Sequence, residues 1–172
     1  MPLVSLLTSA ILDVHHDQAN NWLYLDWKGP QKLADVQHAG QLLLALIAQT
    51  GTSKLLNDST HVTYLPLKTV HWVAREFLPE VGRAGGEYMA WVSGRHLSCY
   101  NNIGLIVQPP GQHPYVVAFE DVAGACVWLN NLADAQSSEL VPEPSANKAR
   151  PVRQRYRQPA VPIGNPLIGR AP

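Results

Sequence analysis

Charged side chains are scarce in this sequence. Only 15 % of its 172 residues are Asp, Glu, Lys or Arg, and the two signs balance at 13 each. Average proteins carry about 25 %. This scarcity argues against a disordered polyelectrolyte and against a histone-like nucleic-acid binder, because both depend on a large excess of charge.

Long hydrophobic runs are also missing. The stretches of greatest length, such as residues 41–48, fall far short of the roughly 20 residues that cross a bilayer, so no transmembrane helix is expected. Residues 1–7 contain no Lys or Arg, which argues against a secretory signal. We therefore expect a cytoplasmic protein.

Cysteine is rare as well. Cys99 and Cys126 lie far apart in the sequence and form no Cys-x-x-Cys pair. This spacing favours neither a zinc ribbon nor a disulfide framework. No cofactor and no metal are expected.

The zero net charge conceals a division of the chain. Residues 1–135 have a formal charge of −4, and residues 136–172 have a formal charge of +4. The second segment holds 7 of the 14 prolines and has no Trp or Phe, so it can bury little apolar surface. We predict one folded domain at 1–135 and a flexible Pro/Arg-rich basic tail at 136–172.

Hydrophobic periodicity within residues 1–135 predicts an α/β domain. Apolar residues spaced by 3.6 positions predict helices, and short apolar runs bounded by turn residues predict strands. The expected strands are 10–15, 22–27, 54–58, 87–92 and 115–119, and the expected helices are 31–49, about 69–82 and about 121–135. A short helix or loop is expected at 93–102, and residues 103–107 extend it or form a strand. Right-handed crossovers then give a mixed, mostly parallel sheet with an N-terminal hairpin and helices packed on it.

This order of elements resembles the STAS (SpoIIAA-like) domain, the fold of bacterial anti-sigma-factor antagonists. Segments 21–29, 54–63 and 72–79 resemble a branch of small bacterial proteins in that superfamily, and the likeness covers about residues 10–135. It implies a module of bacterial signalling that binds a protein. Lipid-binding relatives of the Sec14 type share the fold, so it also implies a second possibility, an apolar ligand held between helix and sheet.

The sequence departs from the phosphorylated members of that family at one point. Their acceptor serine lies in an Asp-Ser-Ser-Gly-like motif at a helix start, and residues 65–69 here, Leu-Pro-Leu-Lys-Thr, have neither serine nor glycine. Thr69 is the only hydroxyl near this helix start. We interpret Thr69 as an N-cap, and a phosphate there would also gain from the helix dipole and from Lys68.

A partner-binding face is expected around this loop and helix, because in anti-sigma antagonists the equivalent segments contact the partner. A homodimer is possible. The predicted face, with residues 60–68 as a loop, consists of Thr60, His61, Tyr64, Lys68, Thr69, His71, Trp72 and Arg75.

Other kinds of site have weaker signals. His15, His16, His61 and His71 could approach Asp58, but none has a metal-ligand spacing. Neither Cys99 nor Ser59 lies in a recognisable nucleophile motif, so no enzyme is expected. Trp22 and Trp27 should face opposite sides of their strand, with one in the core and the other exposed or under a partner. The arginines of residues 150–157 predict a solvated linker, docking on the acidic domain, or weak binding to polyanions.

Overall fold

The computed structural model describes residues 3–93, 106 and 111–135. Six strands form one sheet in the order β1-β2-β3-β4-β5-β6. β1, β2 and β3 are antiparallel neighbours, whereas β3, β4, β5 and β6 are parallel. The predicted mixed sheet is therefore confirmed. The strands are β1 (Leu3–Thr8), β2 (Leu12–Asp17), β3 (Trp22–Pro30), β4 (Lys54–Tyr64), β5 (Tyr88–Ser93) and β6 (Tyr115–Phe119).

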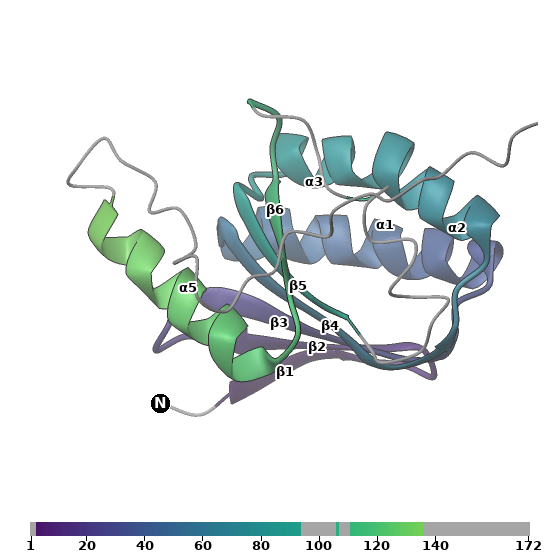
Figure 1. Ribbon diagram of the computed structural model, residues 1–172, viewed down its shortest axis with the longest axis horizontal. Helices are drawn as coiled ribbons and strands as arrows, with labels where there is room; N and C mark the ends of the chain where they lie inside the picture. Colours follow the sequence, from purple (N-terminus) through teal and green to yellow (C-terminus); the bar gives the residue numbers. More distant parts are fainter. Residues whose placement is uncertain (1–2, 94–105, 107–110, 136–172) are drawn as a thin grey trace, which may run out of the picture.

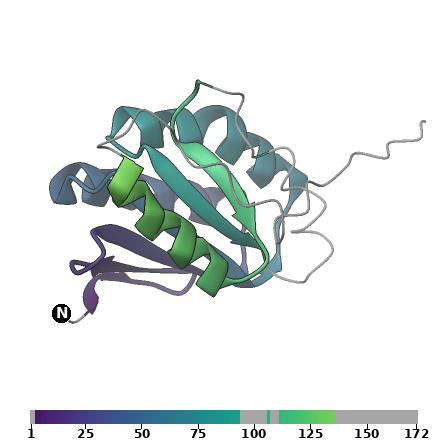
Figure 2. The ribbon, with the colours of Figure 1, turned by 60° about the vertical axis from the view of Figure 1, so that its left-hand side comes forward.

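Helices cover both faces of the sheet (Figures 1 and 2). One face carries α1 (Leu33–Thr50) and a second helical segment. This segment is continuous and consists of α2 (Leu67–Trp72), a π-helical turn η1 (Val73–Phe77) and α3 (Leu78–Arg83). The other face carries α5 (Val122–Ala135), which packs on β4, β5 and β6. Through Trp22, the start of β3 also joins the core under α5.

The spacing of apolar residues explains the two layers. α1 buries Val36, Leu43 and Ile47, which recur at helical intervals, and the chain leaves the helix at Gly51 with φ 64°. On the strands, neighbouring residues face opposite sides, so Leu55 enters the core under α1 and Leu56 enters the core under α5. Alternate residues of the strand are thus buried by different helices, one set under α1 and the other under α5.

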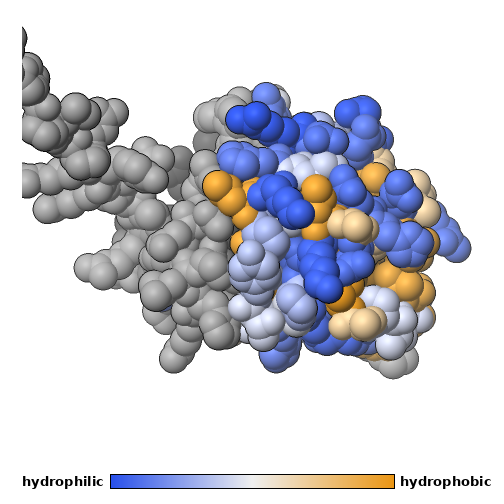
Figure 3. All heavy atoms as spheres, turned by 90° about the vertical axis from the view of Figure 1, so that its right-hand side faces the viewer, coloured by the Kyte–Doolittle hydropathy of each residue, from blue (hydrophilic) through white to orange (hydrophobic). Residues whose placement is uncertain are grey.

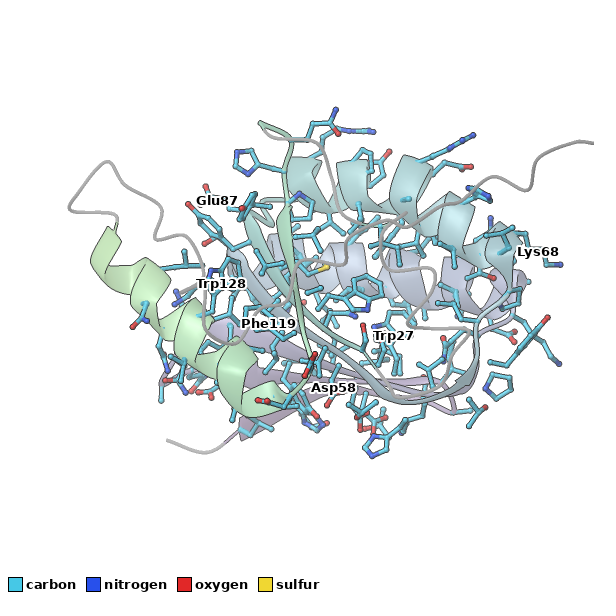
Figure 4. The ribbon with its side chains drawn as sticks, in the orientation of Figure 1. Trp27, Asp58, Lys68, Glu87, Phe119 and Trp128 are labelled. Carbon is cyan, nitrogen blue, oxygen red and sulfur yellow. The ribbon has the colours of Figure 1, made fainter. Side chains whose placement is uncertain are left out.

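The tryptophans follow the same rule. Trp22 packs in the core under α5 and Trp27 in the core under α1, so the prediction of opposite faces is confirmed. The expectation that one of them is exposed is wrong, because both are buried. Trp128 of α5 adds a third buried ring, 5.6 Å from Phe119 between centroids (Figure 4). The sheet has a helix on either side here, so facing away from one core means entering the other.

Two elements differ from the sequence prediction. β1 was not expected, because Leu3–Thr8 shows no clean alternation and becomes a strand only through its pairing with β2. Residues 60–64 were expected in a loop, but β4 continues through them to Tyr64. There Val62 is buried, and Lys28 to Pro30 of β3 supply the paired backbone. Most of the elements predicted over 93–107 lie outside the described residues.

Candidate functional site

A hollow of about 510 Å³ lies on the surface between α1 and the α2–η1 segment. It opens at the side of the molecule where α2 begins. Figure 3 shows this side as mostly hydrophilic with separate hydrophobic spots, and Figure 4 places Lys68 at its outer end. Four predicted partner-binding residues are brought together here. The lining residues are Leu33, Gln37, Lys68, His71, Trp72, Arg75 and Glu76.

Helical spacing explains why these side chains meet. Positions 71 and 72 each lie three or four residues from both 68 and 75, so the four side chains share one face of a helix. Within η1 the backbone widens, and the Leu78 N–H donates to the carbonyl of Val73, five residues earlier. Pro79 has no N–H and would clash with the carbonyl of residue 75 in a regular α-helix. The wider turn relieves this clash, and π turns of this kind are common at functional sites.

Trp72 is held in place by packing on its inner side. Its ring is stacked on Phe77 with centroids 5.5 Å apart and planes 22° apart. A Cβ at Gly40 of α1 would lie 3.0 Å from Phe77 and 3.3 Å from Trp72. The absence of a side chain at Gly40 therefore lets both rings approach α1. Trp72 is half-buried, and its remaining surface lines the hollow.

The charges around the hollow are mainly positive. Lys68 and Arg75 are exposed, and neither forms an ion pair with a carboxylate in the part of the chain that the structure describes. His71 lies between them on the helix, and Glu76 is the one acid that lines the hollow among the described residues. The arrangement places two cations, neither paired with a described carboxylate, on either side of an aromatic surface.

Thr69 does not belong to this surface, which corrects two predictions. The helix begins at Leu67 with Pro66 as its N-cap, so Thr69 is not the cap. Its side chain is fully buried, and its hydroxyl donates to the carbonyl of Gln31 at 3.1 Å. A helical phase of 3.6 residues turns Thr69 inward where Lys68 points outward. The Thr69 hydroxyl is therefore not accessible at this surface.

The β4 residues of the predicted face lie apart from the hollow lining. Thr60 and His61 are exposed on the strand, and the His61 Nδ1 lies 3.0 Å from a carboxylate oxygen of Asp26. This hydrogen bond raises the pKa of His61. Tyr64 is 56 % exposed at the end of β4, just before α2. Of these three residues, only Tyr64 lies beside the start of the helix that carries the hollow.

Sequence reasoning missed a network of buried polar side chains on β4. Asn57 accepts a hydrogen bond from the indole N–H of Trp27 at 2.8 Å and donates to the Ser59 hydroxyl at 3.2 Å. Asp58 points to the opposite face and accepts from the Tyr24 hydroxyl at 2.8 Å and from the Thr60 N–H at 2.9 Å. The run Asn-Asp-Ser after two leucines, at the end of the predicted strand 54–58, was the available signal.

This network stabilises the fold and shows no activated group. Burial, and then the bond to Asp58, raise the pKa of Tyr24, so its hydroxyl stays a neutral donor. Burial also raises the pKa of Cys126, which opposes thiolate formation. Among the described residues, no three His, Cys, Asp or Glu side chains gather as a metal site would require. Cys99 lies outside the described residues.

A separate cavity lies between the sheet and the helices α1 and α2. Its volume is about 40 Å³, and apolar side chains dominate its lining. The Gln31 Oε1 atom is buried beside it and has no hydrogen-bond partner among the described residues. Such a space suits a water molecule, whereas drug-sized ligands occupy roughly 300 Å³ or more.

Within the described part of the chain, no helix combines the length and the apolar character needed to cross a bilayer. Comparison with protein-family models, curated proteins and solved structures finds no match for this chain.

Proposed function

We propose that the domain is a non-catalytic protein-binding module and that the hollow between α1 and α2–η1 is its binding surface. The partner is an acidic segment of another protein that carries at least one apolar side chain. The observation that carries the proposal is the fixed ring of Trp72 between Lys68 and Arg75, neither of which forms an ion pair with a described residue.

The aromatic ring and the two cations of the hollow each have a role in binding. A tryptophan that is already packed on one side loses little conformational freedom when a partner covers the other, which is why such rings are enriched among interface residues of high energy. Exposed cations raise the rate of encounter with an acidic partner and select against a basic one. Binding should therefore weaken as salt is added.

Apolar surface continues beyond the hollow at the β4–α2 connection. Tyr64 and Leu67 are 56 % and 53 % exposed, although both are large and hydrophobic in most of their surface. A stable interface covers about 800 Å² on each partner, more than one hollow supplies. Tyr64 and Leu67 extend the proposed surface toward that size.

The resemblance to STAS domains supports the same surface, because the loop and helix equivalent to residues 60–75 form the partner face in anti-sigma antagonists. A role in bacterial signalling follows as part of the proposal. Regulation by phosphate at Thr69 is not proposed, since that hydroxyl is buried. The basic tail contributes weak, salt-sensitive attraction to polyanions.

Binding of an apolar ligand between helix and sheet has less support. The cavity found there among the described residues measures about 40 Å³. A lipid-like molecule needs several times this space. A protein partner on the outer surface requires no such opening of the core.

Charge reversal at Arg75 tests the proposal against a matched control. Arg75 and Arg83 are both exposed on the same helical segment, but only Arg75 lines the hollow. We expect Arg75→Glu to reduce at least tenfold the recovery of a partner from the source lysate, measured by quantitative mass spectrometry. Arg83→Glu should retain it, and added salt should lower it. Equal recovery with both variants contradicts the proposal.

A further inference from the structure

The β1 edge of the sheet has unusual chemistry for an exposed strand. β1 is the outermost strand on its side and pairs only with β2 among the described strands. Its sequence, Leu-Val-Ser-Leu-Leu-Thr, contains no charged residue and no proline. Natural proteins usually place charges or prolines on such edges, because the free N–H and C=O groups otherwise pair with another chain. A bulge between Ser5 and Leu7 is the one protective feature that β1 shows.

Large apolar side chains on β1 are exposed. Leu3 is 49 % exposed and Val4 is 36 % exposed. Val4 pairs with His16, two residues from buried Val14, so Val4 faces the side of the sheet that α1 covers. Leu7 pairs with Val14 itself on that side and packs against the core. The apolar layer of the core therefore continues outward to the edge.

Helix α1 adds to the same patch. Gly40 marks the flank of α1 that contacts Trp72 and Phe77. Helical geometry places Leu42 and Leu46 on the other flank, about 120–160° around the axis from Gly40. α1 lies between the α2–α3 segment and the β1–β2 strands in both ribbon views (Figures 1 and 2), so this flank is directed toward the β1 side. Leu42 is 41 % exposed there, and Leu46 is partly buried against the core.

We propose that this patch, formed by β1 together with Leu42 of α1, is where a second copy of the chain binds. The two β1 strands pair in antiparallel orientation about a twofold axis normal to the sheet. This axis keeps both α1 helices on one face, so their Leu42 flanks are directed toward each other across it. The dimer is an interface separate from the hollow and does not depend on the function proposed for it.

Charge favours a second copy as the occupant. β1 brings no charge to its own twin, so no like charges are opposed in the paired strands. The nearest carboxylates in the sheet, Asp13 and Asp17, lie on β2, and the Leu42 flank of α1 also carries Asp35, two helical turns before Leu42. In the dimer the two β2 strands are three strand spacings apart, about 14 Å. This distance exceeds the screening length of about 10 Å at 0.1 M salt.

The symmetry of β1–β1 pairing gives a closed dimer and not a fibre that continues to grow. Pairing of β1 with its own copy uses the same surface twice, so the assembly closes as a dimer. Pairing of β1 with the β6 edge of another copy would leave both outer edges free and would continue into a fibre. The bulge shortens the regular ladder, so we expect a dimer that dissociates on dilution.

Sedimentation velocity of the full chain tests the dimer. We expect the protein to approach twice the chain mass of 18.9 kDa at about 100 µM. Val4→Lys should place a charge at the paired edge and weaken association at least tenfold. Val127→Lys changes an equally apolar side chain, 61 % exposed on α5, and should sediment like the unmodified chain.

Leu42→Lys provides a second test at an exposed helix position, where a lysine does not disturb strand β1. It should also weaken association, and thermal unfolding of each variant shows whether it is folded. A chain that sediments as a monomer throughout overturns the proposal. The proposal is also overturned if Val4→Lys or Leu42→Lys is folded and still forms the dimer.

Discussion

At the scale of single residues, the most informative side chains are the buried polar groups of β4. A buried polar group is tolerated when its hydrogen bonds are made, and leaving one unmade costs more than the bond itself contributes. Asn57 and Asp58 satisfy this condition through Trp27 and Tyr24, which come from the neighbouring strand β3. These bonds fix the pairing of β3 with β4 where the sheet carries helices on both faces.

Removal of the Tyr24 hydroxyl tests how much one such bond contributes to the free energy of unfolding. Tyr24→Phe deprives the buried Asp58 carboxylate of a donor at 2.8 Å. We expect a loss of about 1–3 kcal/mol in the free energy of unfolding, measured by urea denaturation at pH 7. Tyr64→Phe is the matched control, because Tyr64 is 56 % exposed and its hydroxyl forms no hydrogen bond to the described residues. Equal stability of the two variants would show that Asp58 is satisfied without Tyr24.

His61 supplies a residue-scale prediction about pH. Its hydrogen bond to Asp26 raises the folded-state pKa above the ordinary value of 6.5. The bond therefore stabilises the fold fully below about pH 6.5, and this contribution is lost as the pH rises through the raised pKa. The effect is small, well under 1 kcal/mol, because the His61 side chain is 65 % exposed.

An NMR titration of the imidazole measures this shift directly. We expect a pKa above 6.5 for His61 in the unmodified chain and a lower value in Asp26→Asn. The stability lost in His61→Gln should be larger at pH 5.5 than at pH 8. A His61 pKa that Asp26→Asn leaves unchanged would argue against the pair.

At the scale of elements, close approaches of backbone decide how the helices sit. Gly82 near the end of α3 lies against His113, and a Cβ at position 82 would meet the His113 carbonyl well inside van der Waals distance. Backbone atoms cannot move aside as a flexible side chain can. Gly82 therefore allows α3 to approach the segment that leads into β6.

Gly82→Ala should destabilise the protein, although alanine normally stabilises a helix relative to glycine. Gly82→Ala gains up to about 1 kcal/mol in helix propensity, but the clash costs about 1–3 kcal/mol or more, so we expect net destabilisation. Gly124→Ala in α5 is the control, since its Cβ would make only an ordinary contact at 3.4 Å. Chemical denaturation should show opposite signs for the two variants. Stabilisation by Gly82→Ala would contradict the close approach.

The helical segment from α2 to α3 shows how a single residue alters an element. The sequence predicted a regular helix over about 69–82, and the structure has one continuous helical segment over 67–83 with a π turn inside it. Pro79 was the available signal, because it cannot donate to the carbonyl four residues earlier. Its effect on Trp72 and Arg75 depends on how η1 packs against α1, which the sequence pattern does not specify.

At the scale of the whole molecule, the two proposed surfaces lie on opposite flanks of α1. Gly40, on one flank, lets Trp72 and Phe77 pack beside the hollow, while Leu42, on the other, extends the β1 edge. A twofold dimer through β1 therefore leaves both hollows free. Such an assembly presents two equal binding surfaces, which increases the avidity for a partner that is itself a dimer.

The sequence by itself determined the class of fold and the faces of its elements. Periods of 3.6 and 2 residues are local properties, so they identified α1, the parallel strands and the opposite orientation of Trp22 and Trp27. The grouping of Lys68 with His71, Trp72 and Arg75 came from the resemblance to STAS domains, with Lys68 expected in the loop before the helix. The chain order then limited the sheet to a hairpin followed by parallel strands, because crossovers have one hand.

Only the tertiary structure decided which of these residues are accessible. Thr69 lies within the same stretch of sequence as Lys68, yet its burial depends on the carbonyl of Gln31, 38 positions away. β1 is a strand because β2 pairs with it, and Trp72 and Phe77 pack closely on α1 because Gly40 has no side chain. Contacts of this kind join segments distant in sequence, and no local pattern encodes the distance between them.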